Sequence, residues 1–168
     1  MAIMTRTRSH AAATRTTRTV CGRYATGCVS IDRHLRVTGE SWWPTETITA
    51  DDVDTLIGRA SGGLDVLFTH DAPTLPPGMR PLGDPVLRAD CAASTAHVAR
   101  AVEVTAPKLL LHGHYHRRYT STYGTTRVEG LASDIEAPWP GSWVVLDLAD
   151  LAVTEPVVAA VSNRSLWA

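Results

Sequence analysis

The sequence contains no apolar run that approaches the roughly 20 residues required of a membrane-spanning helix. Its N-terminus also lacks the apolar stretch that marks a secretory signal peptide. These two absences argue against a membrane-spanning or exported protein. They predict a cytoplasmic protein that has no membrane partner.

Cysteine and lysine are both scarce. The three cysteines are Cys21, Cys28 and Cys91, and Lys108 is the only lysine. An odd number of widely spaced cysteines predicts neither a disulfide framework nor a zinc ribbon, and favours reduced thiols. The formal net charge of −1 gives no general attraction to polyanions, so we do not expect nucleic acid as a partner.

The first 23 residues differ from the rest of the chain. They contain five arginines and no acidic residue, and residues 5–19 show neither helical nor strand periodicity. We expect residues 1–23 to form a disordered basic leader with few contacts to the rest. Such a segment could be an arm for nucleic acid or membrane, or a transit peptide. We favour a non-native leader in front of a truncated gene.

Residues 24–168 read as one domain in which strand and helix patterns alternate. The apolar and capping patterns predict helices over about 50–60 and 89–105, with Thr49 capping the first. A loop rich in proline and glycine is expected over 74–88. Strands are expected over about 24–30, 64–69, 108–111, 118–123, 126–131 and 142–147. This order predicts an α/β fold, in which an α/β layer is followed by a β-rich edge.

Histidines follow the two most apolar of these strands. His70 comes directly after the first, and His112, His114 and His116 come at the end of the second. Because ligands bind at the carboxyl ends of strands in α/β sheets, both groups should meet at one rim. In an extended backbone, the i, i+2 spacing of His114 and His116 would point both rings the same way. Imidazole is the commonest metal ligand, so we expect a metal site here.

Two stretches resemble a known family. Leu109–His116, LLLHGHYH, resembles the closing Gly-His-any-His motif of calcineurin-like metallophosphoesterases, and Val66–Pro73, VLFTHDAP, resembles the motif before it. The resemblance covers roughly residues 24–148. It implies the C-terminal half of a four-layer αββα sandwich and metal-dependent hydrolysis of a phosphoric ester. It also implies two divalent ions, of manganese, iron or zinc, with His70 and His114 on one and His116 on the other.

The opening motifs of that family are not found in the places where the family has them. Gly-Asn-His does not occur, the Gly-Asp at Gly83-Asp84 comes after His70, and Asp32-Arg33-His34 falls where the family has the region after Gly-Asn-His. The bridging carboxylate and the general-acid histidine are thus expected to be missing. We therefore expect a truncated hydrolase that is weak or inactive alone, its other half lost or supplied by another polypeptide. The alternative is a catalytically dead remnant that acts as a binding module. An upstream DNA block encoding the missing motifs would favour the first.

The neighbours of these histidines allow more than one interpretation. Asp71 could orient His70 or a bound water, or form the turn before Ala72-Pro73. His112, at the end of its strand, either packs in the core or supports a ligand from behind. Of Arg117 and Arg118, one could bind a substrate phosphate, although a solvated start of a hairpin fits equally well.

Overall fold

The structure is a computed structural model that describes residues 2–6, 24–25, 36–60, 63–81, 83–133 and 141–155. Two α-helices, α1 (Ala50–Arg59) and α2 (Pro85–Thr105), and one short 3₁₀ helix, η2 (Pro44–Glu46), are found there. The strands are β1 (Ala2–Arg6), β2 (Tyr24–Ala25), β3 (Val66–Thr69), β4 (Leu109–His112), β5 (Tyr119–Tyr123), β6 (Thr126–Gly130), β7 (Trp143–Asp147) and β8 (Val153–Thr154). In these parts, no helix is long and apolar enough to cross a membrane.

The larger sheet has the strand order β2-β3-β4-β6-β5. Its first four strands are parallel, and β5 pairs with β6 as an antiparallel hairpin. In the register between β3 and β4, Thr69 lies opposite His112. The residues that follow these two strands therefore leave the sheet at the same edge, as the sequence predicts.

The two helices begin at side-chain caps. The side chain of Thr49 accepts a hydrogen bond from the backbone N–H of Asp52, so the predicted start of α1 is confirmed. Helix α2 begins at Pro85, four residues before the predicted position, because Asp84 caps it and accepts hydrogen bonds from the next two free N–H groups. Proline suits the first turn of a helix, where its missing N–H costs nothing. The loop predicted over 74–88 therefore ends at Asp84.

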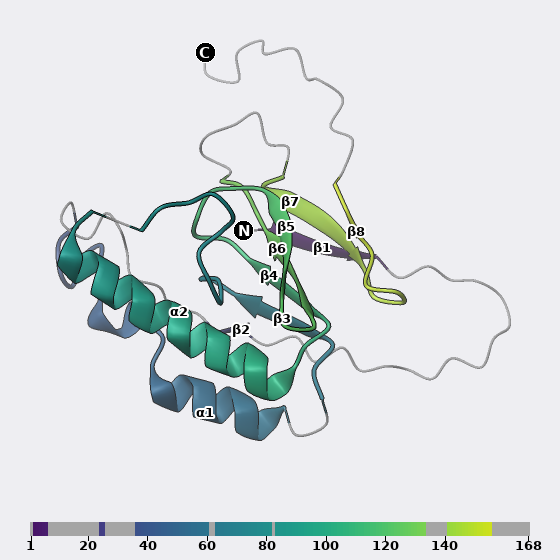
Figure 1. The fold of residues 1–168 in the computed structure, drawn as a ribbon, viewed down its shortest axis with the longest axis horizontal. Helices are drawn as coiled ribbons and strands as arrows, with labels where there is room; N and C mark the ends of the chain where they lie inside the picture. Colours follow the sequence, from purple (N-terminus) through teal and green to yellow (C-terminus); the bar gives the residue numbers. More distant parts are fainter. Residues whose placement is uncertain are drawn as a thin grey trace, which may run out of the picture.

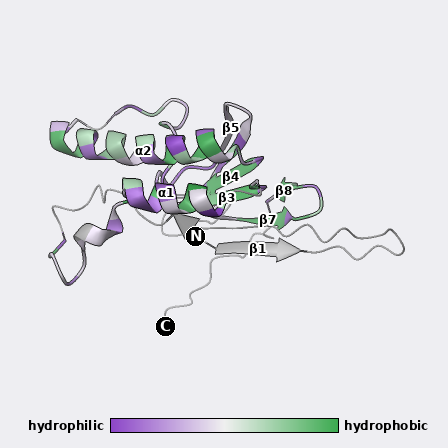
Figure 2. Ribbon diagram, turned by 90° about the horizontal axis from the view of Figure 1, so that it is seen from below, coloured by the Kyte–Doolittle hydropathy of each residue, from purple (hydrophilic) through white to green (hydrophobic). Residues whose placement is uncertain are grey.

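Side chains on opposite faces of β3 and β4 build two separate apolar cores. Leu67 and Leu110 pack with residues of α1 and α2, whereas Val66, Leu109 and Leu111 pack with Val144 and Leu146 of β7. Figure 1 shows both helices on one side of the larger sheet and the smaller sheet on the other. Figure 2 shows that β3, β4 and β7 are predominantly apolar, while each helix has polar and apolar positions. Strands buried on both faces require such continuous apolar runs.

The smaller sheet has the order β1-β7-β8 and corrects one expectation. Residues Ala2–Arg6 form a strand that pairs in parallel with the whole of β7. The predicted disorder and lack of contacts are therefore wrong for these five residues, since pairing with a partner strand supplies the order that local periodicity did not show. Residues 7–23 lie outside the described residues, and so do 156–168.

The described residues form a mixed α/β fold with two sheets and two α-helices. The hairpin β5–β6 and the strand β7 lie close to their predicted ranges. The first predicted strand is described only at Tyr24–Ala25.

Candidate functional site

Two of the predicted ligands, His70 and His114, lie side by side at the edge where β3 and β4 end. Their ring centroids are 5.2 Å apart, with an angle of 54° between the ring planes. The backbone N–H of Gly113 donates to the carbonyl of His70 at 3.2 Å, which ties the two loops together. The parallel register of the strands thus brings together histidines that are 44 residues apart in sequence.

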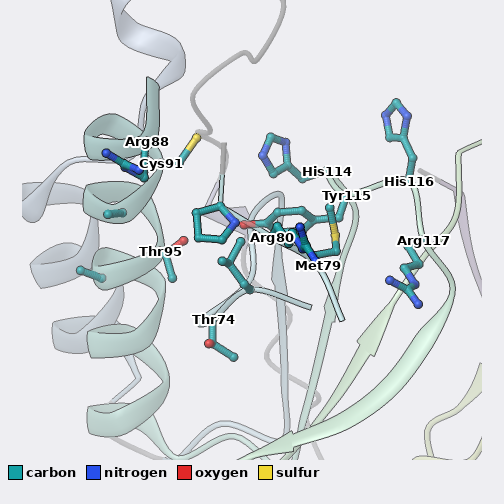
Figure 3. Close-up of a pocket in the computed structure, with 14 residues that line it drawn as sticks. Thr74, Met79, Arg80, Arg88, Cys91, Thr95, His114, Tyr115, His116 and Arg117 are labelled. Carbon is teal, nitrogen blue, oxygen red and sulfur yellow. The ribbon is translucent and has the colours of Figure 1, made fainter. Parts of the chain in front are cut away.

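The backbone at His114 and His116 is not extended, so the condition under which their spacing would align the two rings is not met. Both residues have left-handed conformations, with φ of 67° and 52°, and the N–H of Tyr115 turns back onto the carbonyl of Gly113 at 2.8 Å. A succession of turns replaces the alternation of a strand, so the i, i+2 spacing does not set the direction of the rings. Figure 3 shows the ring of His116 well apart from that of His114.

The described residues contain no group of three or more His, Cys, Asp or Glu side chains that could hold a metal ion. His70 and His114 therefore form a pair of imidazoles, without a third such donor among the residues that the structure places. Burial lowers the pKa of His70 and of His114, and the charge of Asp71 opposes this only in part. Both rings consequently favour the neutral form, which is the form that binds metal ions.

Asp71, the residue after His70, is 1% exposed. Its Oδ1 accepts a hydrogen bond from the N–H of Ala72 at 2.7 Å, and its carbonyl accepts one from the hydroxyl of Thr69 at 2.6 Å. These contacts match the turn-forming role. Asp71 also hydrogen-bonds the side chain of Tyr115, whose pKa is raised first by burial and then by the charge of Asp71. A buried carboxylate thus fixes the loop after β4.

His112 packs in the core, the first of its two expected roles. It is fully buried, and its Nδ1 lies 2.8 Å from the carbonyl of Gly113, which can only accept. Nδ1 therefore carries the proton, and Nε2 accepts from the hydroxyl of Tyr119 at 2.6 Å. Burial lowers the pKa of His112 to about 4, so the ring is neutral at pH 7. With both nitrogens engaged inside the protein, it offers no donor to a ligand.

A cavity of about 790 Å³ opens beside His114. One wall is the face of α2 that carries Cys91 and Thr95, and the opposite wall is the loop after β4 (Figure 3). Its lining contains three arginines and no acidic residue; the residues are Thr74, Leu75, Met79, Arg80, Pro81, Arg88, Cys91, Ala92, Thr95, Ala96, His114, Tyr115, His116 and Arg117.

The two consecutive arginines have different environments. Arg118 donates to Glu129 at 2.6 Å and to Glu155 at 2.6 Å, so these two carboxylates neutralise its charge. Arg117 is exposed and lines the cavity, with its guanidinium next to the backbone of Gly78. Of the two candidates for an anion contact, the position therefore selects Arg117. Arg80, which no motif marked, lines the same cavity because the loop 74–81 folds over it.

No protein-family model matches the sequence, and no curated protein matches it.

Proposed function

We propose that this chain belongs to a metal-dependent phosphoric ester hydrolase resembling the calcineurin-like metallophosphoesterases, with weak or no turnover as a chain alone. The observation that carries the proposal is the pairing of His70 and His114 at the edge of a cavity lined by arginines. The α-β-β order of layers is what half of an αββα sandwich would have, and it supports the proposal without being specific to it.

The donor set fits one divalent ion better than two. Two neutral imidazoles at this separation are suitable ligands for manganese, iron or zinc, and would leave further positions for water and substrate. A two-ion centre needs a carboxylate between the ions, and none joins the pair among the described residues. When bound, an ion would supply a Lewis acid for a phosphoryl oxygen.

The chain's own residues would bind and orient the ester. Arg117 and Arg80 provide guanidinium groups for a phosphate, which planar guanidinium groups bind through paired hydrogen bonds. Asp71 and Tyr115 would hold the loop after β4, and with it His114, against α2. These residues bind a phosphate without requiring its hydrolysis, which is why the alternative of a binding module stays open.

The alternative is favoured because, among the described residues, no third donor joins His70 and His114. If the chain is a catalytically dead remnant, it should bind phosphate at the arginines and hold at most one weakly bound ion. The binding-module proposal uses the same site as the hydrolase proposal and differs from it only in turnover.

Metal binding and hydrolysis separate these possibilities. We would titrate Mn²⁺ by calorimetry into the wild type, His70→Ala and His114→Ala. The control is His97→Ala, since His97 lies in the middle of α2. We expect binding to be lost in the first two variants and kept in the third. Turnover of bis(4-nitrophenyl) phosphate that disappears in His114→Ala would favour the enzyme, and phosphate binding without turnover the module. Equal Mn²⁺ affinity in all four proteins would refute the metal site.

A further inference from the structure

The cavity beside His114 is much larger than a phosphate group needs. Its volume of about 790 Å³ falls in the range of pockets that enclose whole organic ligands, roughly 300–1,000 Å³. The part beyond the arginines must therefore accommodate something other than the phosphate. The side chains that line it indicate the chemistry of that second group.

Most of the uncharged lining is apolar. Leu75 and Met79 from the loop 74–81 line the cavity and are 37% and 36% exposed. Ala92 and Ala96 of α2 line it as well. Apolar side chains that line a cavity favour an apolar occupant, because binding removes the apolar surfaces of both the occupant and the lining from water.

Carboxylates and carboxamides are the side chains missing from the lining. Among the described residues that surround the cavity there is no Asp, Glu, Asn or Gln. Sugars and nucleobases are commonly bound through such side chains, and carboxylates commonly pair with cationic headgroups. The uncharged polar side chains are threonines and Tyr115, and the hydroxyl of Tyr115 is already engaged by Asp71 and Thr95.

The three arginines of the lining come from three elements: Arg80 from the loop 74–81, Arg88 from α2 and Arg117 from the loop after β4. The guanidinium of Arg117 passes close to Gly78, where an added Cβ would be 3.9 Å from its Nη1. Arg117 follows directly on His116, and His114 lies at the other end of the turn (Figure 3). An anionic group beside Arg117 would leave the rest of its molecule between α2 and the loop 74–81.

We infer that the cavity binds the organic group of the phosphoric ester, and that it selects an uncharged, ring-sized apolar group such as an aryl group. The inference rests on the proposed function, because the phosphate is assigned to the arginines and histidines. It adds the class of substrate, namely aryl phosphoric esters in preference to sugar phosphates, nucleotides and esters of small alcohols.

Matched phosphonates test this selection without hydrolysis. We would measure the binding of phenylphosphonate, methylphosphonate and uncharged benzyl alcohol by calorimetry in the presence of Mn²⁺. Ala92→Trp and Ala96→Trp fill the cavity from two positions of α2, and Ala93→Trp is the control, exposed on the same helix and outside the cavity. Thermal melting of each variant verifies its folding.

We expect phenylphosphonate to bind about 30-fold more tightly than methylphosphonate, since burial of the additional ring carbons contributes most of the difference. This preference should disappear in both cavity-filling variants and persist in Ala93→Trp, while methylphosphonate affinity stays unchanged. Equal affinity for the two phosphonates, or the same preference in all variants, would overturn the inference.

Benzyl alcohol separates this inference from the proposed function. If neither phosphonate binds, but benzyl alcohol binds to the wild type and Ala93→Trp and not to Ala92→Trp, the apolar cavity stands and the phosphate site fails. If none of the three compounds binds to the wild type, the inference fails as well.

Discussion

Gly130, the last residue of β6, leaves space for the ring of Tyr119 on the neighbouring strand. A Cβ at position 130 would lie 2.2 Å from Cε1 and 2.4 Å from Cδ1 of that ring. Because carbon atoms approach each other comfortably only to about 3.5 Å, Gly130→Ala would force the ring back by roughly 1.3 Å. The hydroxyl of Tyr119 would then leave Nε2 of His112, which it now contacts at 2.6 Å.

The expected loss of folding stability has two contributions. Overpacking of this kind typically costs about 1–3 kcal/mol. Loss of a hydrogen bond to a buried group such as the His112 ring adds about 1 kcal/mol. We therefore expect Gly130→Ala to lower the free energy of unfolding by about 2–4 kcal/mol. For a chain of this length, that corresponds to a fall in Tm of roughly 5–15 °C.

The assay is urea denaturation followed by circular dichroism, carried out as a double-mutant cycle with Tyr119→Ala. In the Tyr119→Ala background the ring is gone, so Gly130→Ala should cost less than about 1 kcal/mol; the small remainder comes from the carbonyl of Arg117, 3.1 Å from the added Cβ. The control is Gly58→Ala on α1, where nothing lies within 4 Å of the added Cβ. It should stabilise the protein by about 0.5 kcal/mol. An equal cost of Gly130→Ala in both backgrounds would refute the steric argument.

Four further outcomes are expected. Thr49→Ala should lower the free energy of unfolding by about 1 kcal/mol in urea titrations because α1 loses its cap, whereas Thr55→Ala within the same helix should not destabilise it. Arg118→Ala should cost about 1–3 kcal/mol because the buried carboxylate of Glu129 loses its 2.6 Å ion pair and keeps the longer one to Arg127 and the hydrogen bond from Thr120, while Arg117→Ala should leave Tm unchanged and weaken methylphosphonate binding. Since the pKa of His112 is depressed to about 4 in the fold, its stabilising contribution is present above pH 6.5 and is lost as pH falls towards 4; the metal-free protein should lose roughly 2–4 kcal/mol there, and His112→Phe should flatten this slope. Mn²⁺ at 100 times its Kd should stabilise the wild type by about 2.7 kcal/mol in thermal melts, and EDTA should reverse the gain.

Local pattern was sufficient for most of the secondary structure. The apolar runs that became β3 and β4 are buried on both faces, and a run of that kind has no other stable environment in an α/β protein. The cap at Thr49 and the periodic apolar residues of α1 placed that helix to within a residue. The start of α2 was missed because proline and glycine before Asp84 resemble a loop, although proline directly after a cap is a common first helical residue.

The strand β1 could not be predicted from the local sequence pattern. Ala2–Arg6 has no alternating pattern, and its order comes from backbone hydrogen bonds to β7, some 140 residues along the chain. Whether segments so far apart in the sequence pair depends on the rest of the fold, and the five residues themselves do not specify it.

For the site, the sequence by itself determined that His70 and the histidines after β4 share one edge. Only the tertiary structure decided how each side chain is placed there. His114 and His116 have left-handed backbone conformations, His112 is buried in the core, and Arg118 is held in ion pairs while Arg117 lines the cavity. The physical reason is that residue type and strand order are local properties, whereas side-chain direction and burial depend on neighbours supplied by distant segments.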